Sequence, residues 1–172
     1  WRWVRFTSNE RADTLFSCHH ALFETLGGVP REILYDNAKT IVNTRDAYAQ
    51  GHHRWHPGML DLAKRYGFLP RLCRPYRAQT KGKVERFHRF LRGNFYVPLS
   101  SWLKQSGLVL DVDTANAEVG KWLRDVANKR VHPITQAAPI TLFEQREHAA
   151  LRPLPAFETS PALAHLLPPV ID

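Results

Sequence analysis

Short apolar runs alternate with amphipathic stretches over the first 95 residues, and this alternation constrains the fold more than any other feature. Trp1–Phe6 alternates in side-chain type and is rich in aromatic and β-branched residues, which predicts a strand. Ile33–Tyr35 is a continuous apolar run, typical of a strand buried on both faces, and Phe68–Cys73 predicts another strand. The order strand, helix, strand, helix, strand, helix is typical of an α/β domain.

Helical patterns fill the intervals between these strands. Thr7 and Glu10 match a capping box, which predicts the start of a first helix, and Gly27 predicts its end. A second helix is predicted over Pro57–Tyr66, with proline in its first turn and glycine after its last residue. A third is predicted from residue 81 to about residue 94, and its apolar side chains fall on one side.

The sequence changes character beyond residue 95. Residues 100–107 indicate a short helical piece or a loop, and residues 113–129 predict a helix with Trp122 in the core. Another short helix is predicted from about residue 139, and repeated prolines near the end are typical of a tail or linker. We expect three parts: a partial α/β core over 1–95, a helical part over 96–151, and a Pro-rich tail or linker over 152–172.

The composition favours a polyanionic partner. Lys and Arg number 24 against 16 acids, a formal net charge of +8, which suits nucleic acid but also a ribosomal or membrane-surface protein. Cys18 and Cys73 lack metal-ligand or redox spacing, so we expect a reduced, intracellular protein. The chain has no initiator Met and opens on an apolar strand pattern, which leads us to expect a truncated protein.

The positive charge is concentrated in one stretch. Residues 71–92 hold eight basic residues and one acid, Glu85, and therefore +7 of the net +8. A groove that follows a DNA backbone needs such a concentration, because each phosphate contact releases counterions. On a helix, Glu85 falls on the same side as the bases, where it either relieves their repulsion through a weak salt bridge or holds a metal ion.

Asp36 follows a predicted buried strand. The carboxyl ends of strands are where open α/β sheets bind ligands. Asp36 and Asn37 also suit a simple turn, and from position alone both readings stay open, although the turn is favoured for Asn37. Together with Glu85, Asp36 forms the acid pair that a magnesium-dependent phosphoryl-transfer site uses.

Three stretches carry a resemblance to a known family: GGVPREILYDN, HPGMLDLAKRYGFLPRLCRPYRAQTKGKVER and ITLFEQREHAALRPLP. Together they resemble the IstA-type insertion-sequence transposases, and the similarity runs from about Trp1 to Pro155. These transposases belong to the DDE integrase superfamily, with the catalytic core of retroviral integrases and an RNase H-like fold. The resemblance implies that residues 1–95 form a partial RNase H-like integrase core that lacks its first strands.

The resemblance implies roles for individual residues. Asp36 would be the second acid of the catalytic triad and Glu85 the third, both binding Mg²⁺, for which Mn²⁺ can substitute. The first acid lies on the first strand of the fold, which we expect to be absent here, and Asp13 is a poor replacement because it sits in a first helical turn. The expected contacts to the DNA backbone are Arg74, Arg77, Lys81, Lys83, Arg86, Arg89 and Arg92.

The implied reaction is strand transfer, in which a 3′-hydroxyl at a transposon end attacks a phosphodiester of target DNA. The implied partners are transposon and target DNA, further copies of the chain in a homo-oligomer, and an ATPase helper. We expect a bacterial cytoplasmic protein that acts at the nucleoid. The alternatives are a non-catalytic DNA-binding module or decayed transposase, and a nuclease of the same fold.

A few other residues allow a functional reading. His52, His53 and His56 suggest zinc, but no cysteine pair or fourth ligand at suitable spacing accompanies them, so a polar loop is favoured. His88 is either a DNA or site contact or an ordinary surface residue. Tyr76 suits base stacking, although core packing is commoner.

Overall fold

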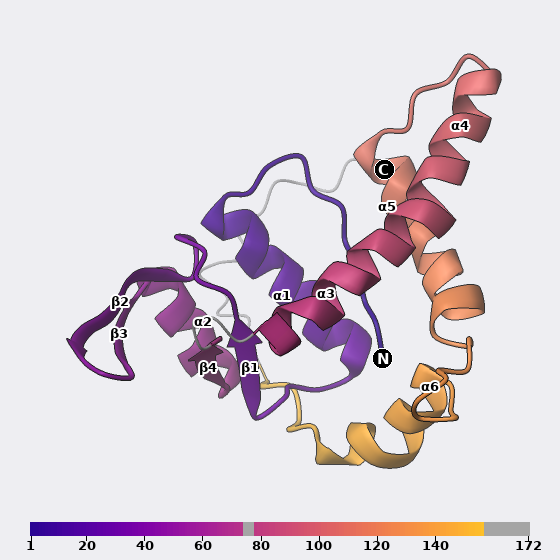
Figure 1. Cartoon of the computed structure of the whole chain (residues 1–172). Helices are drawn as coiled ribbons and strands as arrows, with labels where there is room; N and C mark the ends of the chain where they lie inside the picture. The colour runs from indigo at the N-terminus through magenta and orange to yellow at the C-terminus, as the bar shows by residue number, and fades with distance from the viewer. Residues whose placement is uncertain (74–77, 157–172) are drawn as a thin grey trace.

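The computed structural model describes residues 1–73 and 78–156 (Figure 1). Strand β1 pairs in parallel with β4, and β2 pairs antiparallel with β3 as a hairpin. The mixed α/β class predicted from the sequence is confirmed. The first elements along the chain are α1 (Ala12–Leu26), β1 (Glu32–Tyr35), β2 (Val42–Ala49), β3 (His52–Trp55), α2 (Pro57–Tyr66) and β4 (Leu69–Leu72).

Helices make up most of the remaining structure. One helical path runs through α3, a π-helical turn η1 and α4, and it forms the long rod in Figure 1. Residues 157–172, which hold most of the predicted tail, lie outside the described residues. The later elements are α3 (Ala78–Leu91), η1 (Arg92–Tyr96), α4 (Val97–Gln105), α5 (Val112–Trp122), η2 (Leu123–Ala127), α6 (Pro139–Leu142), η3 (Phe143–Glu147) and η4 (His148–Ala150).

A first hydrophobic core lies between α1, α2 and strand β1. Phe23 of α1 and Met59 of α2 are fully buried in it, together with Val29 and Phe68. Leu15, Phe16 and Leu22 of the same helix also pack against this core, so burial of one apolar side holds α1 in place.

A second core joins the long helical rod to α5 and η2. Phe95, Val119 and Leu123 are buried here. The predicted core role of Trp122 is confirmed, because its ring lies 5.3 Å from that of Phe90 and 5.5 Å from that of Phe95. Packing against this core fixes the direction of α3.

Residues 1–6 do not form the predicted strand. The segment belongs to no sheet, and its Val4 and Phe6 side chains pack against the second core. Backbone groups of Arg2 and Phe6 bond the side-chain amides of Asn128 and Asn116. A strand needs a neighbouring strand to satisfy its backbone, and here two asparagines take that place.

The predicted capping box at Thr7 and Glu10 is wrong. Helix α1 begins at Ala12, and its N-cap residue Arg11 makes no side-chain capping bond. Instead Asn9 Oδ1 accepts from the Arg11 amide (3.0 Å) and from the Thr14 hydroxyl (2.8 Å). The short polar side chain of Asn9 therefore organises the turn before the helix.

The prediction that Ile33–Tyr35 is buried on both faces is also wrong. Exposure alternates along β1, and the Leu34 side chain is 53% exposed while Ile33 packs on the first core. Within residues 1–73 and 78–156, no layer covers the outer face of this strand.

The chain returns to its N-terminal half after η4. Val29 and Arg152 exchange backbone hydrogen bonds of 2.9 Å in both directions, and the Arg152 guanidinium donates to the Gly67 carbonyl. These contacts close the fold around the C-terminal ends of α1 and α2. Within the described part of the chain, no helix has the length and apolar character needed to cross a bilayer.

Candidate functional site at the ends of the parallel strands

Asp36 lies at the carboxyl edge of the parallel pair. It directly follows β1 and is exposed. The Cys73 amide donates to the Tyr35 carbonyl at 2.8 Å, which extends the β1–β4 pairing to the residue before Asp36. The structure thus places Asp36 where the sequence predicted it, at the strand edge where α/β sheets bind ligands.

Tyr35 anchors this edge to the core. Its hydroxyl lies 2.8 Å from Nε2 of His19, which is only 7% exposed. His19 Nδ1 lies 2.8 Å from the Leu15 carbonyl, an acceptor only, so Nδ1 carries the proton and Nε2 accepts from Tyr35. Burial raises the pKa of Tyr35 and lowers the pKa of His19, so both side chains are neutral.

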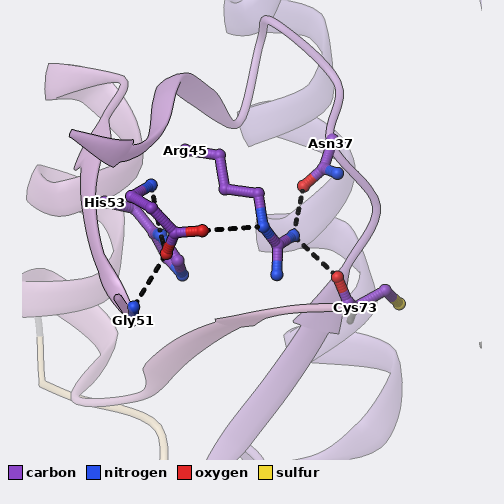
Figure 2. A network of polar contacts seen from close by, with 6 residues as sticks. Asn37, Arg45, Gly51, His53 and Cys73 are labelled. Atoms are coloured by element: carbon purple, nitrogen blue, oxygen red, sulfur yellow. Dashed lines mark hydrogen bonds and ion pairs between the residues drawn. The ribbon is translucent and has the colours of Figure 1, made fainter. Parts of the chain in front are cut away.

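Arg45 of β2 connects the two strand ends (Figure 2). Its Nη1 donates to Asn37 Oδ1 at 3.0 Å and to the Cys73 carbonyl at 2.8 Å. Asn37 therefore binds Arg45, a role that the sequence reading did not consider. Arg45 itself was missed because the polar stretch 38–56 shows no pattern that singles out one arginine.

Asp46 fixes Arg45 from the other side and shapes the hairpin. Its Oδ2 lies 3.4 Å from Arg45 Nε, and its Oδ1 accepts from the Gly51 amide at 2.7 Å. The Gly51 bond is the main cause of the lowered pKa of Asp46, and the charges of His53 and Arg45 lower it further. Asp46 is thus a stable anion beside Arg45.

Glu85 lies on α3 and is exposed, as are Arg86, Arg89 and Arg92. Among the described side chains, Glu85 forms no ion pair or hydrogen bond. Glu85 is therefore exposed among exposed arginines, and none of the side chains that the structure describes occupies its carboxylate. Val84, predicted on the apolar side, is 54% exposed, while Phe87 and Phe90 pack on the second core as predicted.

The other predicted DNA contacts are less defined. Lys81 and Lys83 lie on α3, but their side chains are outside the described structure, and Arg74, Arg77 and Tyr76 are outside the described residues. Four residues, 74–77, lie between Cys73 and the start of α3 at Ala78, so the five Cα–Cα steps span at most about 18 Å. Arg71 of β4 forms an ion pair with Glu32 of β1 at 2.8 Å. This ion pair holds the Arg71 side chain on the β1–β4 sheet.

The polar loop predicted around the three histidines is wrong, because His52 and His53 lie on strand β3 and His56 precedes α2. His56 caps α2 by accepting from the Gly58 amide at 3.2 Å, and His53 Nδ1 lies 3.0 Å from the Asp46 amide. His52 is exposed on β3, and His88 is exposed on α3. Over the described ranges, no three His, Cys, Asp or Glu side chains form a metal-binding group.

Comparison with known proteins identifies the family. A putative transposase for insertion sequence element IS5376 of Geobacillus stearothermophilus is 35% identical over 155 residues, 90% of this chain and 35% of that protein. The transposase for insertion sequence element IS21 of Pseudomonas aeruginosa is 37% identical over 141 residues, 80% of this chain and 33% of that protein.

The transposase for insertion sequence element IS640 of Shigella sonnei is 38% identical over 108 residues, 63% of this chain and 31% of that protein. The chain thus spans about a third of the length of these curated relatives. No protein-family model matches the chain. The identities extend over most of this sequence, and the chain belongs to the insertion-sequence transposases related to that of IS21.

Proposed function

We propose that Asp36 and Glu85 act in a magnesium-dependent DNA strand-transfer site of the intact transposase. The observation that carries the proposal is that both carboxylates are exposed and, within the described structure, have no hydrogen bond or ion pair. Asp36 follows β1, and Glu85 lies on the helix that follows β4, the parallel partner of β1. The relatives are transposases, which supports the reaction class.

The donor chemistry of these residues fits Mg²⁺. Exposed carboxylate oxygens are hard ligands that this ion accepts together with water and substrate phosphates, so Asp36 and Glu85 would hold it. When bound, the metal would activate the attacking 3′-hydroxyl and stabilise the leaving oxygen. The RNase H-like integrase core and the first acid of its triad belong to this proposal only through the family resemblance.

The basic side of α3 would hold DNA in the same site. Arg86 and Arg89 are exposed on α3, which carries Glu85, and Arg92 is exposed at the start of η1, which continues that helix. Arginines at such positions bind phosphates and fix the register of the duplex, and they do not read the bases. DNA as partner is part of this proposal, and a homo-oligomer and an ATPase helper stay predictions from the resemblance.

Strand transfer by the intact transposase with Mg²⁺ tests the acid pair. We expect Glu85→Gln and Asp36→Asn each to lower the rate roughly a hundredfold or more, because metal polarisation is worth several kcal/mol. Glu144→Gln is the matched control, since Glu144 is an exposed helical glutamate on η3. DNA binding measured beside the rates should be unchanged or tighter in the acid variants.

Three outcomes contradict the proposal. Wild-type rates in Glu85→Gln would remove Glu85 from the site. DNA binding that falls steeply with salt, without strand transfer or cleavage in the wild type, would identify a binding module. Release of cut ends without joining would identify a nuclease, in which water replaces the 3′-hydroxyl.

A further inference from the structure

We propose that Arg45 is a positioning residue that ties the ends of β1 and β4 together and thereby holds Asp36 in place for a divalent cation. The inference rests on the proposed function of Asp36. Nothing in the sequence pattern singles out Arg45, and the role follows from its contacts alone (Figure 2).

The contacts hold the residues on both sides of Asp36. On one side, the Tyr35 carbonyl accepts from the Cys73 amide at 2.8 Å, and the Tyr35 hydroxyl bonds His19. On the other side, Asn37 Oδ1 accepts from Arg45 Nη1 at 3.0 Å. The backbone of Asp36 is therefore held at both neighbours while its carboxylate stays exposed.

The same arginine nitrogen also binds the second strand. Arg45 Nη1 donates to the Cys73 carbonyl at 2.8 Å, just before the connection that leads to α3 and Glu85. A single guanidinium thus links the residue after Asp36 to the end of β4. Loss of this link would free both strand ends, although each strand would keep its ladder bonds to the other.

Arg45 is held in this position and is poorly placed to bind DNA itself. Its side chain is 24% exposed, and its buried Nε lies 3.4 Å from the Asp46 carboxylate without a hydrogen-bond acceptor. Two bonds to the strand ends occupy Nη1. Removal of a group that orients a metal ligand without binding the metal itself typically lowers metal affinity about 10- to 100-fold.

The test uses the intact transposase with Arg45→Met, which keeps the apolar stem and removes the donors. Arg54→Met is the matched control, because Arg54 is an exposed arginine on the same hairpin and its loss removes the same charge. Two quantities are measured: hydrogen–deuterium exchange of peptides covering residues 33–40 and 69–73 without DNA or metal, and the Mg²⁺ concentration that gives half-maximal strand transfer.

We expect Arg45→Met to speed exchange in both peptides and to raise the half-saturating Mg²⁺ concentration roughly tenfold. At saturating Mg²⁺, Arg45→Met should recover most of the wild-type rate of strand transfer. Arg45→Lys keeps a charged donor, so its exchange rates and half-saturating Mg²⁺ concentration should lie between those of the wild type and of Arg45→Met. Arg54→Met should match the wild type in both measurements. A thermal midpoint checks the fold, and Asn37→Leu replaces Arg45→Met if that variant unfolds.

Several outcomes overturn the inference. Equal exchange and equal Mg²⁺ dependence in Arg45→Met and Arg54→Met would leave Arg45 without a positioning role. If Arg45→Met leaves exchange unchanged but reduces the slope of log DNA affinity against log salt by about 0.9, Arg45 is a phosphate contact instead. Asp36→Asn separates the two proposals: if it keeps full activity, the proposed function fails, whereas if it is inactive while Arg45→Met behaves as Arg54→Met, only the present inference fails.

Discussion

Asn128 bonds both backbone polar groups of Arg2. Its Oδ1 accepts from the Arg2 amide at 2.9 Å, and its Nδ2 donates to the Arg2 carbonyl at 2.9 Å. Asn116 binds Phe6 in the same way, at 2.8 and 3.0 Å. Two side chains of the α5–η2 region thus take the place that a neighbouring strand would have along residues 1–6.

Replacing Asn128 should therefore destabilise the chain. Asn128 is 3% exposed, and Asn128→Ala would leave two backbone groups of Arg2 without partners. We expect the free energy of unfolding to fall by about 2 kcal/mol, the usual cost of losing such buried bonds. Urea denaturation measures it, with Asn94→Ala as a control of about 0.5 kcal/mol or less, since Asn94 is exposed. Equal midpoints for the two variants would show that the Arg2 bonds do not stabilise the fold.

Gly28 should tolerate no side chain. A Cβ at this position would lie 2.7 Å from the Arg152 carbonyl oxygen and 2.8 Å from Leu151 Cβ. Gly28→Ala must push residues 151–152 away and break their pairing with Val29. We expect this to lower the free energy of unfolding by about 1–3 kcal/mol. Gly120→Ala, in the open on α5, should instead stabilise by about 0.5–1 kcal/mol. Thermal denaturation of both variants checks the opposite signs, and a stable Gly28→Ala would mean that the 151–152 segment does not dock here.

His19 should make stability fall in mild acid. Burial lowers the pKa of His19 from its usual 6.5, so the unfolded chain takes up a proton first as the pH drops. The contribution of His19 to stability is therefore complete above about pH 6.5 and is lost below it, at up to about 1.4 kcal/mol per pH unit. The loss ends once the pH has passed the folded-state pKa.

Unfolding free energies at about pH 7 and about pH 5.5 test this dependence. His19→Gln should be less stable at neutral pH and should show a smaller loss on acidification. His52→Gln, at an exposed histidine, should keep the wild-type loss. The same acid loss in His19→Gln as in the wild type would assign the proton uptake to another group.

The exposed arginines Arg86 and Arg89 of α3 and Arg92 of η1 should contribute to DNA affinity equally for any DNA sequence. Arg86→Gln, Arg89→Gln and Arg92→Gln should each weaken binding to unrelated duplexes by similar factors. Each should also reduce the slope of log affinity against log salt by about 0.9, one phosphate contact. Arg124→Gln is the control, because Arg124 is exposed on η2 and lies beside Asp125. Fluorescence anisotropy over a range of salt concentrations measures both the affinity and the slope. Wild-type slopes in all three variants would show that these arginines do not contact DNA phosphates.

The sequence by itself determined both ends of α2 and the end of α1. Helix α2 spans Pro57–Tyr66 as predicted, because proline suits a first helical position and Gly67 takes the left-handed conformation (φ 72°) that ends it. Gly27 ends α1 for the same reason (φ 70°). These signals act over four or five residues, so a linear reading finds them. The placement of Asp36 directly after a strand followed from the same short-range pattern.

Only the tertiary structure decided which distant groups meet. The hairpin β2–β3 lies in the polar stretch 38–56, and its pairing is not readable from that stretch because it depends on a partner strand and its register is irregular. Residues 1–6 have a strand-like pattern but form no strand, since asparagines of the α5–η2 region satisfy their backbone. Arg45 reaches Asn37 and Cys73 across 8 and 28 positions of sequence. Hydrogen bonds over such separations depend on packing of the whole chain, and no local pattern encodes them.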